Sequence, residues 1–280
     1  MDILVTTEWL AQNLEAGDLR IVDASYHLPA SGRNAHAEYC AGHIPGALFL
    51  DLGNLADNDA AGDNTLPDAP VFAARMEALG ISRTDRVVLY DNSPLHSSAR
   101  GWFIMQLFGM EQVAVLDGGL ARWEAQGRPV SQDEPKITPA RFEPRMNAAA
   151  VRDKDAVLAN LSGGAEQMVD ARSAARFTGQ EKEARPGMAS GHIPGARNLP
   201  IGMLYEADGR MKDKIALRAE FEAAGIDPER PVITSCGSGV TAAVLFLALT
   251  LIGNDTASLY DGSWAEWGAD PATPKATGRA

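Results

Sequence analysis

A single cysteine in a glycine-containing loop is the strongest candidate for chemistry in this sequence. Cys236 follows the apolar, β-branched residues 232–234 and precedes Gly-Ser-Gly at 237–239. The residues 240–252 are almost all apolar and are followed by Gly253, a pattern that predicts a helix. A loop between a buried strand and a helix N-terminus points backbone N–H groups inward, where the helix dipole adds positive charge. Both effects favour the thiolate form of Cys236, which is the nucleophilic form.

The alternative role for Cys236 is packing, because free cysteine is among the most buried residue types. The glycines that follow it and the helix behind the loop favour the reactive interpretation. The backbone N–H groups of Gly237, Gly239, Val240 and Thr241 then form a cradle for an anion on the sulfur or attached to it.

Composition and charge narrow the class of protein. The chain has 280 residues, which is comfortable for two domains, and its formal net charge is −12. This charge argues against nucleic acid and anionic membrane surfaces as partners. The longest apolar run, 240–252, is too short to span a bilayer, and the first residues lack a signal-peptide pattern. We therefore expect a globular, cytoplasmic protein.

Only two cysteines occur, Cys40 and Cys236. They form no disulfide scaffold, and neither belongs to a Cys-x-x-Cys or Cys/His pattern typical of metal sites. We expect neither a metal nor an organic cofactor. Cys40 lies near the end of a short predicted helix, where we expect it to serve packing.

The sequence contains an internal duplication. Gly-His-Ile-Pro-Gly-Ala occurs at 42–47 and again at 191–196, an offset of 149. Val-Asp-Ala recurs at an offset of 147, and Asp-Gly-x-x-Ala-x-Trp recurs at an offset of 144. Matches in the same order at a nearly constant offset predict two copies of one fold. The first copy spans 1–130, a Pro- and charge-rich linker spans 131–145, and the second copy spans 146–280.

The two copies differ at the candidate site. Superposing them places Asp91 where Cys236 stands, and the residues after Asp91 lack the Gly-x-Gly pattern. Only the second copy can therefore carry thiol chemistry at this place. His43 and His192 occur in both copies, so we expect them to have a structural role, such as a ring N–H bonded to the backbone.

Short apolar strands alternate with helices in both copies, which predicts an α/β fold with a mainly parallel sheet covered by helices on both faces. In the first copy we expect helices at 7–14, 70–79, 97–108 and 119–125, and strands at 20–23, 87–90 and 113–116. In the second copy we expect helices at 151–161, 215–224 and 240–252, and strands at 168–170, 232–234 and 257–260.

These motifs together resemble a known family. A duplicated domain with Gly-His-Ile-Pro-Gly-Ala in each copy, and Cys-Gly-Ser-Gly-Val-Thr-Ala at 236–242 in the second copy only, is similar to the two-domain rhodanese sulfurtransferases. Within that family the loop resembles that of 3-mercaptopyruvate sulfurtransferases. Thiosulfate-preferring members carry Arg and Lys where this chain has Gly237 and Ser238, and a dianion such as thiosulfate is better held by cations beside the thiol.

The resemblance implies that Arg176 and Arg185 bind the substrate, because the family's substrate-binding arginines occupy the matching positions. The planar Arg fork suits a carboxylate, and an α-keto acid presents carboxylate and carbonyl oxygens side by side. The alternative is that both arginines are solvated in a loop that also contains Glu181, Lys182 and Glu183.

The implied reaction has two steps. The Cys236 thiolate takes sulfur from 3-mercaptopyruvate and releases pyruvate, and the persulfide then passes its outer sulfur to cyanide, a small thiol or a thioredoxin-like protein. Ser238 is expected to hydrogen-bond the substrate carbonyl or to protonate the leaving enolate. Some family members back this serine with a histidine and an aspartate. Asn64 and Gly53 stand at those positions here, and neither can shuttle a proton in the same way.

Three other functions stay open from the sequence. A thiosulfate:cyanide sulfurtransferase would use the same persulfide with another donor. A cysteine phosphatase would need an arginine six positions after Cys236, and that residue is Ala242. A non-enzymatic sulfur relay would keep the chemistry of Cys236 and change only the acceptor.

Overall fold

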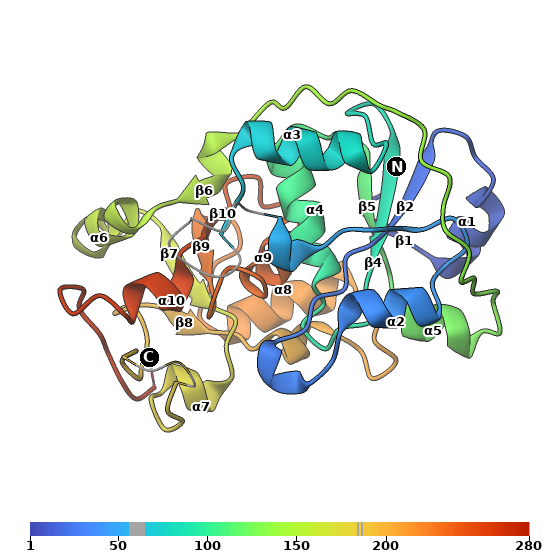
Figure 1. Ribbon diagram of the computed structural model, residues 1–280. Helices are drawn as coiled ribbons and strands as arrows, with labels where there is room; N and C mark the ends of the chain where they lie inside the picture. The colour runs from blue at the N-terminus through green and yellow to red at the C-terminus, as the bar shows by residue number, and fades with distance from the viewer. Residues whose placement is uncertain (56–64, 184, 186, 280) are drawn as a thin grey trace. The chain divides into compact units, whose positions relative to one another are not determined.

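The chain folds into two compact units, seen in a computed structural model that describes residues 1–55, 65–183, 185 and 187–279. The first unit holds residues 1–55, 66–147 and 206–211. The second unit holds Thr65 and the described residues of 148–205 and 212–279. Each unit is built around its own five-stranded sheet (Figure 1).

In the first unit all neighbouring strands are parallel, in the order β1-β5-β4-β2-β3. Its strands and α-helices are β1 (Leu4–Val5), α1 (Thr7–Asn13), β2 (Leu19–Asp23), α2 (Ala35–Ala41), β3 (Leu48–Phe49), α3 (Ala69–Ala78), β4 (Arg86–Tyr90), α4 (Ser98–Leu107), β5 (Val113–Leu116) and α5 (Gly119–Ala125). Short 3-10 turns lie at Pro29–Ser31 and Leu52–Asn54.

The second unit repeats this parallel topology, with the strand order β6-β10-β9-β7-β8. Its strands and α-helices are β6 (Val151–Arg152), α6 (Lys154–Gly163), β7 (Gln167–Asp170), α7 (Ala174–Phe177), β8 (Arg197–Asn198), α8 (Lys214–Ala223), β9 (Val232–Ser235), α9 (Ala242–Leu251), β10 (Ser258–Tyr260) and α10 (Ser263–Trp267). Two 3-10 turns lie at Ala148–Ala150 and Ile201–Leu204.

Alternation along the strands explains why helices cover both faces of each sheet. In β4 of the first unit, Val88 and Tyr90 belong to the apolar cluster that α1, α2 and α5 complete. Leu89 points to the opposite face, where α4 packs so closely that a methyl group on Gly101 would lie 2.5 Å from it. The predicted architecture, with parallel sheets covered on both faces, is confirmed.

The second unit uses the same division of faces. Ile233 and Tyr260 share an apolar cluster with Trp264 and Trp267 of α10. The opposite face of β9 and β10 contacts α9, which is apolar and almost wholly buried. A helix that is apolar all round needs a fully buried position, and this fixes α9 directly behind the loop that carries Cys236.

The repeated histidines have the structural role that their duplication predicts. Nδ1 of His43 lies 2.9 Å from the carbonyl oxygen of Tyr39, and Nδ1 of His192 lies 2.8 Å from that of Phe177. Both rings are buried and stack on the aromatic ring of the same residue that they bond.

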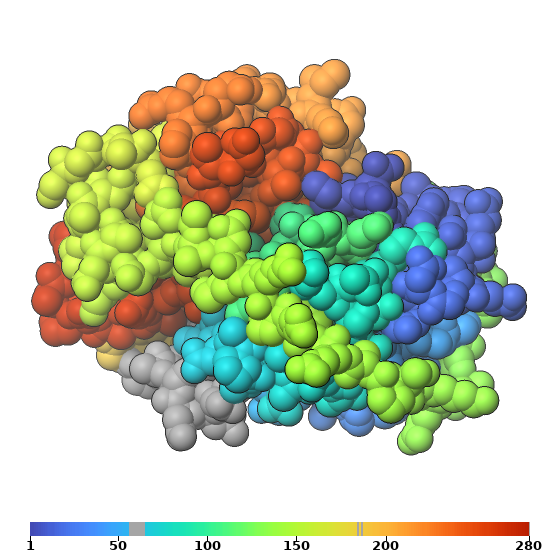
Figure 2. Space-filling view, turned by 90° about the horizontal axis from the view of Figure 1, so that it is seen from above, coloured from blue at the N-terminus to red at the C-terminus, as the bar shows by residue number. Residues whose placement is uncertain are grey.

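One helix boundary was wrong, and one segment has a contact that was not expected. The helix expected at 151–161 is preceded by β6, and α6 begins at Lys154, where the Asp153 side chain accepts a hydrogen bond from Ala156 N–H. The segment 131–145 is mostly exposed, as expected, and it is also attached to the first unit: Phe142 is buried, and its N–H donates to Glu77. Figure 2 shows this yellow-green segment lying along the surface of that unit.

Among the described residues, no helix combines the length and the apolar character that crossing a membrane requires.

Asp91 occupies the place in the first unit that Cys236 has in the second. It follows β4 directly, and its carboxylate accepts hydrogen bonds from the backbone N–H of Ser93 at 2.9 Å and of Ser98 at 2.8 Å. Ser98 is the first residue of α4. The carboxylate therefore satisfies an N–H group at the helix N-terminus and fills the loop with its own negative charge.

We predict that Asp91→Ala lowers the free energy of unfolding by about 2 kcal/mol, because two N–H groups lose their acceptor inside a buried loop. Asp91→Asn keeps one acceptor oxygen and should lose less. Urea unfolding followed by tryptophan fluorescence measures both variants. An unchanged unfolding midpoint in Asp91→Ala would contradict this role for the carboxylate.

Candidate active site

The loop that carries Cys236 lies between β9 and α9, as the sequence predicts. β9 ends at Ser235 and α9 begins at Ala242, so the cysteine sits at the carboxyl end of a central strand and before a helix N-terminus. The chain turns at Gly239 with φ +80°, a conformation that L side chains rarely adopt. Cys236 is 2% exposed, so only a small part of it is reachable from solvent.

The first residues of α10 hold the cysteine loop by three hydrogen bonds to its backbone. Trp264 N–H donates to the carbonyl oxygen of Cys236 at 3.0 Å, and Ala265 N–H donates to that of Gly237 at 2.8 Å. The N–H of Cys236 donates to the side-chain oxygen of Ser263 at 3.1 Å. Both carbonyls are thereby turned toward α10.

Arg176 is the predicted substrate-binding residue that the structure brings to the loop. It lies on α7, and a methyl group on Gly237 would be 3.3 Å from its Nη2 atom. The side chain of Arg176 is 32% exposed, so the guanidinium remains open to a ligand. Position 237 therefore has no side chain at the point where the cation of Arg176 approaches the loop.

A buried chain of ion pairs fixes Arg176 from behind. Nη2 of Arg176 donates to Glu183 at 2.5 Å, and the other carboxylate oxygen of Glu183 accepts from Arg172 at 2.8 Å. Arg172 also bonds both carboxylate oxygens of Asp170. The side chains of Arg172 and Glu183 are 1% and 3% exposed. A long flexible arginine is thus tied through three buried charged groups to the end of β7.

Arg172 is the cation at the centre of these buried ion pairs, between Asp170 and Glu183. Burial lowers the pKa of its guanidinium, but the neighbouring Asp170 and Glu183 carboxylates reverse this effect, so the pKa is raised overall. The guanidinium also lies over the ring of Trp264, 4.6 Å from its centroid. Since Trp264 binds the carbonyl of Cys236, the same cluster supports both Arg176 and the cysteine loop.

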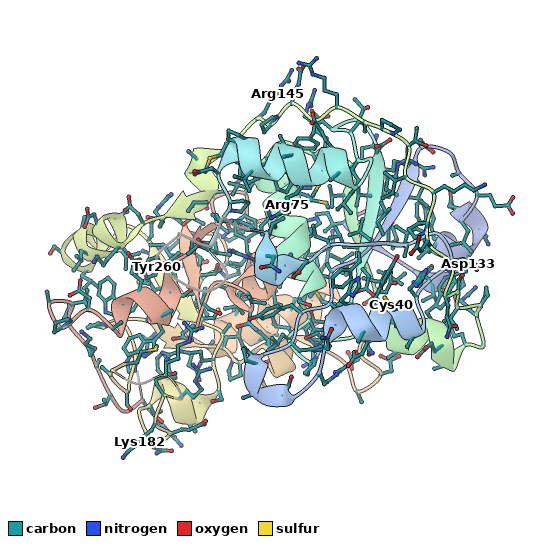
Figure 3. All side chains as sticks on the ribbon, in the orientation of Figure 1. Cys40, Arg75, Asp133, Arg145, Lys182 and Tyr260 are labelled. Atoms are coloured by element: carbon teal, nitrogen blue, oxygen red, sulfur yellow. The ribbon has the colours of Figure 1, made fainter. Side chains whose placement is uncertain are left out.

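The sequence analysis missed the role of Glu183, which it named only as one of the charged residues in the same loop as Arg185. Its neighbours Glu181 and Lys182 are exposed, and Figure 3 shows Lys182 pointing outward beyond α7. One buried acid among exposed charges leaves no periodic signal. The pairing with Arg172 and Arg176, eleven and seven residues earlier, depends on a turn that the sequence pattern does not specify.

The remaining predicted residues differ in their location and exposure. Ser238 is half-buried in the loop. Arg185 is exposed after Glu183, and its contact with a substrate stays a prediction. Asn64 lies outside the described residues. Gly53 lies in a 3-10 turn of the first unit, where its N–H donates to Asp51 at 3.1 Å.

Cys40 does not serve packing as expected. Cys40 lies near the end of α2 (Figure 3) and is exposed, whereas the neighbouring Tyr39 is buried in the core. Within residues 1–55, 65–183, 185 and 187–279, no group of three His, Cys, Asp or Glu side chains lies close enough to hold a metal ion.

The fold and site define a class: a duplicated parallel α/β protein whose second unit alone has a buried free cysteine in the loop between a central strand and a helix N-terminus. The sequence matches the rhodanese-like domain twice, over residues 6–126 and 153–270. The chain belongs to the rhodanese-like family, and the predicted family and duplicated fold are confirmed.

Relatives with assigned activities cover nearly the whole chain. It is 39% identical over 272 residues to the 3-mercaptopyruvate sulfurtransferase of Escherichia coli, covering 96% of each chain. It is 38% identical over 271 residues to the thiosulfate sulfurtransferase of Bos taurus, covering 94% of this chain and 91% of the relative. The structure of SseA from Escherichia coli, a 3-mercaptopyruvate sulfurtransferase, superposes with a TM-score of 0.83 at 36% identity, covering 94% of this chain and 99% of SseA.

We predict that Glu183→Gln lowers the free energy of unfolding by about 3 kcal/mol, because the neutral amide leaves the buried Arg172 with one counter-charge fewer. Denaturant unfolding measures the change. Glu181→Gln, an exposed acid on the same loop, is the matched control and should stay within about 0.5 kcal/mol of wild type. Equal stability of the two variants would contradict the importance of the buried pair.

Proposed function

We propose that this chain is a 3-mercaptopyruvate sulfurtransferase that works through a persulfide on Cys236. The observation that carries this proposal is the pairing, within one unit, of the Cys236 loop with the Arg176 guanidinium beside Gly237. The pairing supplies a nucleophile and, next to it, a cation for a carboxylate.

The first step transfers sulfur to the enzyme. The Cys236 thiolate attacks the sulfur of 3-mercaptopyruvate, a sulfur–sulfur bond forms, and the carbon–sulfur bond breaks. The electrons of the broken bond leave as the pyruvate enolate, which takes a proton from water or from Ser238. The N–H groups from Gly237 to Thr241 at the start of α9 stabilise negative charge on the thiolate and then on the persulfide.

The donor is held by its carboxylate and carbonyl oxygens. Arg176, kept in place by Glu183, binds them with the part of its fork that faces away from the carboxylate of Glu183. We propose that Arg185 adds a second cation from the exposed side of the same loop. This arrangement suits a donor whose charge lies several bonds from the sulfur being transferred.

The second step returns the enzyme to its starting form. An acceptor thiolate, or cyanide in an assay, attacks the outer sulfur of the persulfide, and Cys236 leaves as a thiolate. A small thiol or a thioredoxin-like protein is the proposed natural acceptor, and the cytoplasm is the proposed location.

The structure favours this function over a cysteine phosphatase. That chemistry needs an arginine six residues after the cysteine, to hold the phosphate oxygens in the loop. Ala242 stands at that place as the first residue of α9, and its side chain is fully buried.

We predict that 3-mercaptopyruvate is used with a higher kcat/KM than thiosulfate, with cyanide as acceptor, because residues 237–241 of the cysteine loop include no Arg or Lys that would add to Arg176 in holding a dianionic donor. Steady-state kinetics with both donors measure the preference. Cys236→Ala is the control and should lose transfer from both donors while keeping its unfolding midpoint. Preference for thiosulfate would keep the persulfide chemistry and overturn the donor assignment.

We predict that Arg176→Ala raises the KM for 3-mercaptopyruvate with a smaller effect on kcat, since about 1.5–3 kcal/mol of charged hydrogen bonding to the donor is lost. Arg176→Lys keeps the positive charge but lacks the planar guanidinium, so its KM should lie between those of the wild type and Arg176→Ala. Arg185→Ala tests the second cation in the same assay. Arg230→Ala, an exposed arginine near the opposite end of β9, is the control. An unchanged KM in Arg176→Ala would contradict the proposal that Arg176 binds the donor.

A further inference from the structure

Ser263 has a backbone conformation that its side chain makes unfavourable. Its φ is +48°, in the left-handed region that favours glycine, and it is fully buried as the first residue of α10. Among the described residues other than glycine, only His96 shares a positive φ. A strained residue persists when its surroundings hold it there, so the side chain of Ser263 must have a use.

The hydroxyl of Ser263 connects the end of β10 to the cysteine. It donates to the carbonyl oxygen of Tyr260 at 2.8 Å, which leaves a lone pair on Oγ to accept the N–H of Cys236 at 3.1 Å. Its hydrogen is committed to Tyr260, so Oγ meets Cys236 only as an acceptor. The N–H of Cys236 is thereby directed toward the first residue of α10.

This bond completes the restraint of the Cys236 backbone. The carbonyl before the cysteine, that of Ser235, accepts from Ala171 N–H at 2.9 Å, and the carbonyl of Cys236 accepts from Trp264 N–H at 3.0 Å. With the N–H held by Ser263, the peptide groups on both sides of the cysteine are fixed. Rotation about χ1 is then the main freedom that remains for the sulfur.

The first unit shows what the same place looks like without a nucleophile. There the position of Ser263 is held by Gly119, with φ +58°, and Leu120 N–H donates to the carbonyl of Asp91 at 3.1 Å. Asp91 anchors its loop through its own side chain, by the bonds to Ser93 and Ser98. The backbone bond from the short helix to the loop is the same in both units, but Gly119 supplies no hydroxyl, and a Cβ there would lie 2.6 Å from the carbonyl oxygen of Asp91.

A reactive cysteine cannot anchor its loop in this way, because its sulfur has to stay available to the donor. We propose that Ser263 is a positioning residue for sulfur transfer: its hydroxyl holds the backbone of Cys236 so that the sulfur stays aligned with the N–H groups of the loop. This inference rests on the proposed function for its kinetic consequence only, because the position of the sulfur also governs its reactivity toward any alkylating reagent.

The test compares Ser263→Gly and Ser263→Ala in a Cys40→Ser background, so that Cys236 is the only thiol. Ser263→Gly copies the first unit and removes the unfavourable conformation together with the hydroxyl, so the protein should fold. Ser263→Ala removes only the hydroxyl. Ser258→Ala is the matched control, because Ser258 is a buried serine on β10 whose hydroxyl donates to the carboxylate of Glu166.

The measured quantity is the rate of iodoacetamide alkylation of Cys236 from acidic to alkaline pH, which needs no sulfur donor. Both Ser263 variants should reach half-maximal rate at a higher pH than wild type, because the loop N–H groups no longer meet the thiolate as well. Their kcat for 3-mercaptopyruvate should fall about tenfold or more, with KM changed less than twofold, since misplacement of a reacting atom lowers the rate more than binding.

A wild-type alkylation profile in Ser263→Gly overturns the proposal, whatever the activity of that variant. An unfolding midpoint at or above that of wild type, combined with slower alkylation, supports it and rules out a merely structural role. If the wild-type enzyme transfers no sulfur from 3-mercaptopyruvate, the proposed function fails, and the alkylation profiles still decide the role of Ser263.

Discussion

A nucleophilic sulfur has to be held in place by groups that leave it free to react, and much of the second unit follows from this constraint. The backbone of Cys236 is restrained on both sides. Ala171 N–H bonds the carbonyl of the preceding residue, and Ser263 and Trp264 of α10 bond the N–H and the carbonyl of Cys236 itself. The positively polarised end of α9 faces the other side of the loop. The side chain is thereby positioned without being used as an anchor.

In the first unit, which has the same fold, the side chain at the corresponding position does anchor its loop. Its loop is one residue longer between the strand-end residue and the helix start, and the carboxylate of Asp91 bonds the N–H groups at that end. An anion therefore already occupies the place where the second unit would hold a thiolate or persulfide. The first unit thus shows that this strand–loop–helix geometry can bind negative charge, and the second unit has the side chain of a cysteine residue at the same place in the sequence.

The position of Arg176 depends on a second constraint, the cost of placing a charged guanidinium beside a buried loop. Arg176 is held by Glu183, which is held by Arg172, which in turn bonds Asp170 at the end of β7. The four groups alternate in sign, so each buried charge has a counter-charge. The sheet thereby sets the place of the arginine as well as that of the cysteine, since β7 and β9 are neighbours.

The sequence predicted features that repeat or follow a period. The duplication, the parallel α/β fold and the position of Cys236 before α9 all followed from repeated motifs and apolar runs, and His43 and His192 were expected to be structural for the same reason. Two-residue strands such as β3 and β8 were not expected, because they are too short to show a period. Glu183 and Ser263 were also missed, since a buried ion pair and a left-handed φ are set by tertiary contacts. Aligning Ser263 with Gly119 was the one available signal for the second.

The central claim is that sulfur passes through Cys236, and trapping the intermediate tests it most directly. The enzyme is mixed with 3-mercaptopyruvate in the absence of an acceptor, digested, and its peptides are weighed by mass spectrometry while released pyruvate is counted. The account predicts one additional sulfur atom on the peptide that contains Cys236, none on the peptide that contains Cys40, and one pyruvate for each persulfide. Pyruvate release with no sulfur on Cys236 would contradict it.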